Sequence, residues 1–430
     1  SDLIDTAQAY GNERGVGEGV RTCGIAREKI FVTSKVAAEH KDYKTAAAGI
    51  DGTLRKMGLD YLDMTKGIGM ILVLIGHLQG DSIFTFSPYI QPLCVYIFSF
   101  HMPMFFIVSG ILIAIKNDEV KPLKEVAKSR FRGIMIPYYW FSFFYMIVVV
   151  VALIKGEIAV QTLYLNIWYV ISGYGMNVLW FLPALYLGEL LFIFLRRRIR
   201  DNVPFITIVV LLNAIVYLLS YFVGIAKYPT PFAERMHDLI TVVLRPILVC
   251  GFISIGYYLH KLLKKGTRIG DFFNKPELNE KGKISLKYRS AYIVLGLMLF
   301  GVCFGLFRIN NGIDFRSLAF RNVFFFFVCA LSGSFGMISF CKGLPRIPLF
   351  CYWGIGSLIF MATHNSQTVL TFSLKTAMYV NQYLTRARGY ICYAIVIVII
   401  TAYSTFMIWL IRRFFPFIIG KPFKLPWKKS

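Results

Sequence analysis

The sequence predicts an all-α polytopic membrane protein of about ten transmembrane helices, preceded by a short incomplete α/β segment. Hydrophobic residues make up 57% of the 430 residues. Charged residues make up only 16%, against roughly 25% in soluble domains. The apolar residues are also concentrated in runs such as 203–225 and 391–411, which are long enough to cross a bilayer. A single soluble core could not bury so many long apolar runs.

Residues 1–64 have a soluble character, with a strand-like run at Ile30–Thr33 and a helix-like run at Thr45–Met57. A membrane domain is expected over 65–415, followed by a basic tail at 416–430. The expected spans are 67–85, 92–115, 133–154, 178–195, 203–224, 239–260, 290–308, 318–340, 349–374 and 389–411.

The net charge of +24 follows from 47 Lys and Arg against 23 Asp and Glu. The basic residues alternate with the expected spans. They are abundant in 116–132, 196–200, 261–289 and 412–429, and sparse in 86–91, 155–177 and 225–238. The chain is therefore expected to be a multi-pass protein of the cell (inner) membrane, in contact with membrane lipid. The positive-inside rule places both of its termini in the cytoplasm. The late loops fit this alternation less well, because 375–388 also holds three basic residues. No basic and aromatic groove stands apart from the spans, so nucleic acid is not an expected partner.

Eight cysteines are present, most of them inside apolar spans and none in a CxxC pair. Small buried hydrophobic side chains explain them better than disulfides or zinc ligands do. No metal is expected.

Three histidines fall inside apolar spans at a similar expected depth: His77, His101 and His364. One such histidine is readily explained by a hydrogen bond between helices. Three at one depth favour a site, because polar side chains there usually face a bundle interior or cavity. Neutral imidazole can take a proton from a hydroxyl near neutral pH, which acyl transfer to an alcohol requires. Metal binding by the three is a weaker alternative, because their spacing is not typical of metal ligands.

Arg130 and Arg132 open the third span, and two guanidinium groups at a membrane edge suit a di- or triphosphate. Topogenic charge explains them equally well. Glu189 is an unusual carboxylate within a span, expected to pair with an arginine or to join the site. Trp180 precedes it as an interface anchor or a further site candidate.

The strings YLDMTKGIGMILVLIGH, YIFSFHMPMFFIVSGILI, SRFRGIMIPYYWF, LWFLPALYLGELL and GSLIFMATHNSQ together resemble the acyltransferase-3 family, in particular the fucose 4-O-acetylase-like branch. The resemblance runs from about Leu62 to the C-terminus. It implies transfer of an acyl group, commonly acetyl from acetyl-CoA, to a hydroxyl of a cell-envelope polysaccharide or a lipid-linked sugar. It also implies that His77 and His101 are catalytic and that Arg130 and Arg132 bind the donor. The motif around His364 departs from the family pattern.

The first 64 residues resemble the beginning of an aldo-keto reductase, in the strings LIDTAQAYGNERG and IFVTSK. The resemblance matches three catalytic residues of that family to Asp5, Tyr10 and Lys35. The family's catalytic histidine is missing, and only about a quarter of the barrel is present, without its nicotinamide-binding half. We therefore expect no NADPH binding from this fusion.

The leading hypothesis is a membrane O-acetyltransferase with an acyl-CoA donor and a glycan or lipid-linked sugar acceptor. A transporter or flippase of a lipid-linked glycan is the first alternative, although no internal repeat relates the two halves. Aldo-keto reduction by the N-terminal segment is the second.

Overall fold

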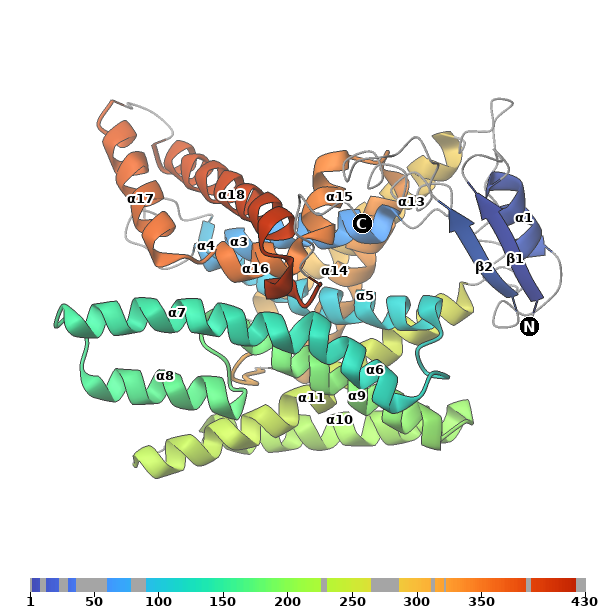
Figure 1. Ribbon diagram of the computed structural model, residues 1–430, viewed down its shortest axis with the longest axis horizontal. Coiled ribbons are helices and arrows are strands. Elements are labelled where there is room, and N and C mark those ends of the chain that lie inside the picture. The colour runs from blue at the N-terminus through green and yellow to red at the C-terminus, as the bar shows by residue number, and fades with distance from the viewer. Residues whose placement is uncertain are drawn as a thin grey trace.

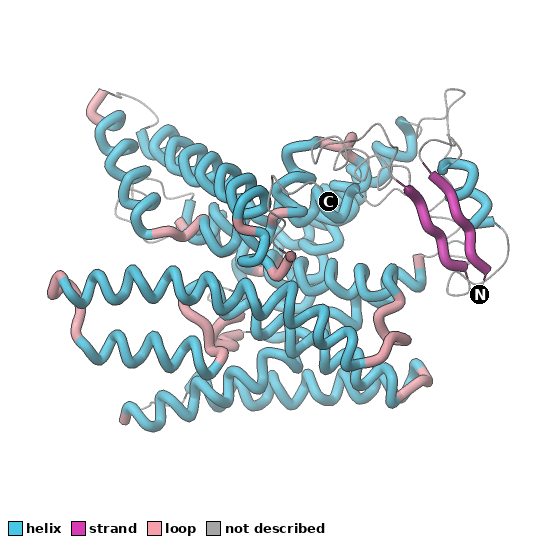
Figure 2. The backbone as a smooth tube through the Cα atoms, in the orientation of Figure 1, coloured by secondary structure: helices cyan, strands magenta, loops and turns pink. Residues whose placement is uncertain are grey.

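The computed structural model describes residues 2–7, 13–22, 30–35, 60–78, 90–225, 230–263, 286–310, 314–320, 322–383 and 388–422. Helices dominate these residues (Figures 1 and 2). Strands β1 (Asp2–Ala7) and β2 (Ile30–Lys35) pair in parallel beside the short helix α1 (Glu13–Thr22). The strand expected at 30–33 is therefore confirmed. The helix expected at 45–57 lies outside the described residues.

The remaining helices form one bundle, which confirms the all-α membrane fold. They are α3 (Asp60–His77), α4 (Ile90–Phe98), α5 (His101–Lys116), α6 (Leu123–Arg130), η4 (Phe131–Met135), α7 (Ile136–Ile154), α8 (Val160–Ser172), η5 (Asn177–Trp180), α9 (Phe181–Arg198), α10 (Asn202–Ile225), α11 (Pro231–Leu262), α13 (Leu286–Leu306), η6 (Phe307–Asn310), α14 (Val323–Gly343), α15 (Pro348–Ile355), α16 (Ser357–Thr363), α17 (Gln367–Asn381), α18 (Arg388–Phe414) and η7 (Pro416–Ile419).

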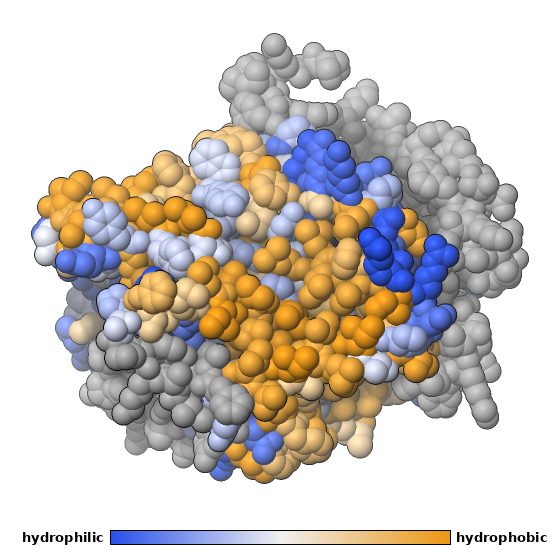
Figure 3. All heavy atoms as spheres, turned by 90° about the horizontal axis from the view of Figure 1, so that it is seen from below, coloured by the Kyte–Doolittle hydropathy of each residue, from blue (hydrophilic) through white to orange (hydrophobic). Residues whose placement is uncertain are grey.

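Eight helical segments in the described part of the chain are long and apolar enough to cross a membrane. Large apolar side chains such as Phe143, Leu218 and Val294 point outward from them. Seen from below, the surface is mostly hydrophobic, with hydrophilic side chains gathered towards its edges (Figure 3). An outward apolar surface of this extent is what a lipid-facing bundle requires.

Two expected spans have a different form in the structure. The ninth, expected as one helix over 349–374, is divided into α15, α16 and α17 by Gly356 and by a turn at 364–366. A side chain at Gly356 would collide with Ile408 of α18, so the break sits where two helices meet closely. The first, α3, carries Asp60, Asp63 and Lys66 in its first two turns, and its expected end at 85 lies outside the described residues.

The structure also differs from the prediction just before the fourth expected span, 178–195. A further helix, α8, precedes it and packs against α7 (Figure 1). Residues 155–177 were expected to form a connecting segment. The apolar residues of this segment recur with a spacing that suits a helix of 13 residues. Helix α7 covers one face of α8.

The centre of the bundle depends on glycines that allow backbones to touch. Gly110 of α5 lies against the carbonyl of Ile253, and Gly256 of α11 lies against the carbonyl of Ile107. Any Cβ at these positions would clash with the facing backbone. Small residues at such crossings are the usual way for membrane helices to pack closely. The contact between α5 and α11 therefore fixes the position of α5, which begins at His101.

Candidate active site

The three membrane histidines converge although they are far apart in the sequence. His77 ends α3, His101 begins α5 and His364 directly follows α16. The ring centroids of His77 and His364 are 5.3 Å apart. The ring of Phe98 lies between His77 and His101, with its centroid 6.1 Å from that of His77 and 5.2 Å from that of His101. We call His77, His101 and His364 the histidine junction. Each of the three lies at the end of a helix.

The protonation of two of these rings follows from their hydrogen bonds. Nδ1 of His101 lies 3.0 Å from the carbonyl oxygen of Ile97, and Nδ1 of His364 lies 2.7 Å from that of Met361. A carbonyl can only accept, so Nδ1 must carry the proton in both rings. In the neutral imidazole Nε2 then holds the lone pair. Nε2 of His364 is buried and has no hydrogen-bond partner among the described residues.

Accessibility distinguishes His77 from the other two. His101 is 4% exposed and His364 is 2% exposed. His77 is exposed, although Phe98 and His364 flank its ring. It is therefore the member of the junction that a molecule from outside the protein can reach.

Two arginines, Arg245 and Arg316, contact each other, and we call them the arginine pair. Arg245 is 1% exposed, in the middle of α11. It donates from Nε to the carbonyl of Arg316 at 2.7 Å and from Nη1 to that of Tyr174 at 2.9 Å. Arg316 lies within electrostatic range of His77.

The short helix η5 connects the arginine pair to the histidine junction. At its first residue, Asn177 accepts a hydrogen bond of 2.9 Å from Asn365, the neighbour of His364. At its last residue, the Trp180 ring lies 5.3 Å from the Arg245 guanidinium. Trp180 is buried and stacks on Phe315, so the structure places this candidate beside the arginine pair.

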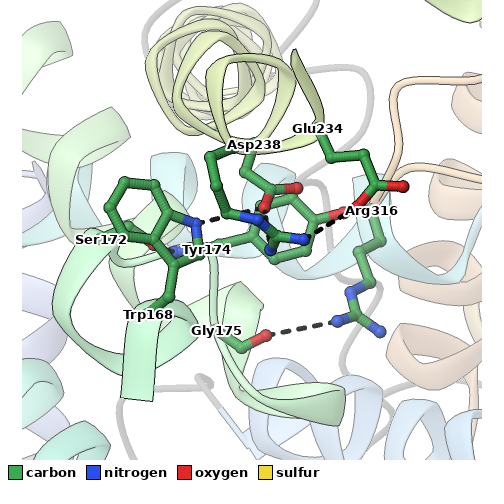
Figure 4. A network of polar contacts seen from close by, with 8 residues as sticks. Trp168, Ser172, Tyr174, Gly175, Glu234, Asp238 and Arg316 are labelled. Carbon is green, nitrogen blue, oxygen red and sulfur yellow. Dashed lines mark hydrogen bonds and ion pairs between the residues drawn. The ribbon is translucent and has the colours of Figure 1, made fainter. Parts of the chain in front are cut away.

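A neighbouring network shows how another arginine here is neutralised (Figure 4). Arg235 forms ion pairs with Asp238 at 2.9 Å and with Glu234 at 3.0 Å. Trp168 donates its indole N–H to the same Asp238 carboxylate, and Arg316 reaches the carbonyl of Gly175 (Figure 4). Carboxylates are thus present close by, yet they pair with Arg235.

At the opposite end of the bundle, which we call the basic end, Arg130 and Arg132 have separate environments. Arg130 pairs with Asp118 at 2.7 Å and with Glu189 at 2.5 Å. Ser109 donates a further hydrogen bond to Glu189. Glu189 is 4% exposed, and its expected pairing with an arginine is confirmed. Residues two apart on a helix do not face the same side, so Arg132 points elsewhere.

Arg132 lines an open groove of about 460 Å³, which we call the basic groove. Its lining residues are Glu125, Lys128, Ser129, Arg132, Gly133, Ile419, Gly420 and Lys421. Three of them are cationic and one is acidic. Arg132 lies in the π-helical turn η4, and such turns are frequent at functional sites. Gly420, with φ of 69°, lies against the carbonyl of Arg132, so the C-terminal turn forms one wall.

The reductase-like residues are only partly described. Asp5 lies on β1 and Lys35 ends β2, where it pairs in register with Ala7. Tyr10 lies outside the described residues. The described sheet has two strands, far from the eight that close a reductase-type barrel.

Seven cysteines are buried and free, as expected of small apolar side chains, and Cys23 lies outside the described residues. Among the described residues, no group of three or more His, Cys, Asp or Glu side chains is placed to hold a metal ion. Arg245 was not among the site residues predicted from the sequence. A charged residue in the middle of an apolar segment, directly before Pro246, was the signal that pointed to it.

Comparison with known families agrees with this geometry. A family described as an acyltransferase domain matches residues 59–273, which is half of the chain. The chain belongs to this acyltransferase family. The matched region contains His77, His101, Arg130, Arg132 and Arg245, and the helices that carry them. It ends before His364 and Arg316, which the structure brings to the same place.

The first residues match a different family. The aldo/keto reductase family matches residues 2–66. The glyoxal reductase of Bacillus subtilis is 49% identical over 61 residues, which is 14% of this chain and 22% of that protein. An aldo-keto reductase of Mycobacterium avium is 45% identical over 62 residues, again 14% and 22%. The chain thus spans under a quarter of the curated relatives it matches. No solved structure matches the chain.

Proposed function

We propose that this acyltransferase moves an acetyl group from cytoplasmic acetyl-CoA to a hydroxyl of a cell-surface glycan or a lipid-linked sugar. The convergence of the histidine junction carries the proposal. Three segments separated by up to 287 residues place imidazole rings around one point, with His77 and His364 5.3 Å apart. A purely structural role for each histidine would not require them to meet.

His77 is the general base in this proposal. It is the exposed member of the junction, so the acceptor hydroxyl can approach it. As His77 takes the proton, the hydroxyl oxygen attacks the thioester carbonyl, and the carbon–sulfur bond of the donor breaks. The thiolate of CoA then takes the proton from His77. An ester and free CoA result, and no other reactant is needed.

His101 and His364 support this step as fixed neutral rings. Each donates Nδ1–H to a backbone carbonyl, so its Nε2 remains an acceptor. The His364 ring, whose centroid lies 5.3 Å from that of His77, limits the orientations that the His77 ring can take. We assign these two residues a positioning role.

The basic groove is the site we propose for the phosphates of the donor. Lys128, Arg132 and Lys421 give it positive charge, and guanidinium binds phosphate through two parallel hydrogen bonds. From the first residue of α3 to His77 the helix rises about 25 Å. The acyl-pantetheine arm would extend along this direction from the groove to the junction. The positive-inside rule supports a cytoplasmic position for the basic end, and with it both termini, in the inner membrane.

The direct test uses the full-length chain in membranes with acetyl-labelled acetyl-CoA. Label should appear in membrane glycan or lipid-linked sugar, as an ester that mild alkali releases. His260, at the far end of α11, provides a control, and His260→Ala should keep the activity. Transfer that is equally fast with His77→Ala and His101→Ala would refute the histidine mechanism. No transfer to any membrane acceptor would refute the function.

A further inference from the structure

We propose that Arg245 and Arg316 bind an oxyanion carried by the acyl acceptor, a sugar carboxylate or a phosphate, beside the histidine junction. The identity of the bound molecule as the acceptor rests on the proposed function. The presence of an anion site does not, because it follows from the contacts of the two arginines alone.

Arg245 is a buried cation with no carboxylate partner among the described residues. Its two donated hydrogen bonds end on backbone carbonyls, which carry no net charge. Its Nη2 is buried and without a hydrogen-bond partner among the described residues. Burying an unpaired charge is costly, and such charges are normally paired or ligand-bound.

Arg316 adds a second positive charge at the same place. Its guanidinium lies 5.3 Å from the Tyr174 ring centroid, and that of Arg245 lies 4.4 Å from the same ring. It makes one long hydrogen bond of 3.3 Å, to the carbonyl of Gly175, and its Nε is also unpartnered among the described residues. Two cations on one aromatic ring repel each other, and an anion between them would remove that repulsion.

The acids near the arginine pair accept hydrogen bonds from groups other than the two guanidinium groups. Asp238 and Glu234, both labelled in Figure 4, pair with Arg235. Asp314 accepts hydrogen bonds from the backbone N–H of Arg316 and from the Ser317 hydroxyl. Asp238 and Asp314 lie within electrostatic range of Arg245. No carboxylate among the described residues forms a direct ion pair with Arg245 or Arg316, so guanidinium N–H groups remain for an anion that a ligand brings.

The position of the pair indicates which substrate brings the anion. Arg245 lies 16 residues from Lys261, or about 24 Å along α11, a depth similar to that of His77. Lys261 marks the basic end through its ion pair with Glu119. The donor phosphates are proposed to stay at the basic groove, so an anion at this depth belongs to the acceptor.

Anion binding can be measured on the full-length chain in detergent, without acyl-CoA. The readout is the midpoint of thermal unfolding at rising concentrations of inorganic phosphate, glucuronate or glucose, which yields an apparent affinity. All samples carry Arg132→Gln, so that the basic groove contributes less. Arg316→Gln is the test variant, because Arg245 also holds two backbone segments. Arg308→Gln, in the neighbouring η6, removes an exposed arginine as the matched control.

We expect phosphate or glucuronate to stabilise the parent and the Arg308→Gln chain, and glucose to have no effect. Arg316→Gln should weaken the affinity about tenfold or more, since a charge-assisted pair of hydrogen bonds is lost. Arg316→Lys should lie between the two. Stabilisation by phosphate points to a phosphate-bearing acceptor, and stabilisation by glucuronate points to an acidic sugar.

Equal affinity in Arg316→Gln, or no stabilisation by either anion, would overturn the site. A chain that binds the anion and transfers no acetyl would refute the proposed function and leave the site standing. A chain that transfers acetyl and binds no anion would refute the anion site and leave the proposed function standing.

Discussion

The histidine junction and the basic groove are two polar regions of one bundle with opposite construction. The junction consists of side chains at helix ends, two of them under 5% exposed, and its neighbouring arginines have no acidic partner among the described residues. The groove is open, and its three cations stand on a surface with a nearby acid. The arginines beside the junction therefore lack a direct ion pair, whereas the charges of the groove are screened by water.

This difference separates the two roles. Electrostatic interactions are stronger in a buried site than at an open surface, so fixed groups at the junction can influence a reacting bond. At the groove, solvent and salt weaken each contact, which suits reversible binding of a charged nucleotide. We therefore expect changes at the junction to affect turnover and changes at the groove to affect donor affinity.

The largest expected effect is at the histidine junction. His77→Ala should lower the turnover of acetyl transfer by about 10²–10⁴-fold, because the general base is lost. The KM for acetyl-CoA should change little, since the phosphates bind elsewhere. Steady-state rates in membranes, normalised to expression, measure both. A His77→Ala chain that keeps its turnover and loses donor affinity would reverse the two roles.

The second prediction concerns the stability that Arg130 gives to the bundle. Arg130→Gln removes the partner of two buried carboxylates, Asp118 and Glu189, and breaking such a pair costs about 3–5 kcal/mol in the free energy of unfolding. Denaturant unfolding in detergent measures the loss. Lys155→Gln, which breaks the exposed pair with Glu157, should leave the stability unchanged and serves as the control. Unchanged stability of Arg130→Gln would mean that the ion pairs do not hold the helices together.

Arg132→Gln should leave the fold intact and weaken the donor. The KM for acetyl-CoA should rise about tenfold, with turnover much less affected, because a binding contact common to ground and transition states is lost. Arg413→Gln removes the same charge from the end of α18, outside the groove, and should change KM little. Added salt should raise the wild-type KM and reduce the difference between Arg132→Gln and wild type.

Gly420→Ala sharpens the same comparison without removing a charge. The glycine has φ of 69° and lies against the carbonyl of Arg132, so a Cβ would push the C-terminal turn away from η4. We expect a rise of a few-fold in the KM for acetyl-CoA. Gly133→Ala, which meets no atom within 4 Å, is the matched control in the same groove. An unchanged KM in Gly420→Ala would remove the C-terminal turn from the donor site.

Sequence patterns predicted the parts of this molecule that depend on chemistry along the chain. Apolar runs gave the membrane fold, and a histidine in each of three spans indicated a shared site, because polar groups in a membrane need a reason to be there. The patterns could not show that His77, His101 and His364 lie at helix ends, because the breaks near Phe100 and at 364–366 depend on packing between distant helices. Arg130 and Arg132 looked equivalent in sequence. Their environments differ because Arg130 pairs with Glu189, which lies 59 residues further along the chain.

The smallest expected effect concerns the N-terminal segment. Its strands β1 and β2 pair with each other, and α3 begins at Asp60, close to the point where the two family matches overlap at residues 59–66. Removal of residues 1–59 should therefore leave acetyl transfer within about twofold of the full chain. Asp60 has to be retained, since it forms an ion pair with Arg346. The full chain should reduce no carbonyl substrate with NADPH, because the segment has two described strands, while a closed barrel of this type needs eight. Loss of NADPH absorbance with methylglyoxal, absent from a Lys35→Ala chain, would show that the fragment is an active reductase.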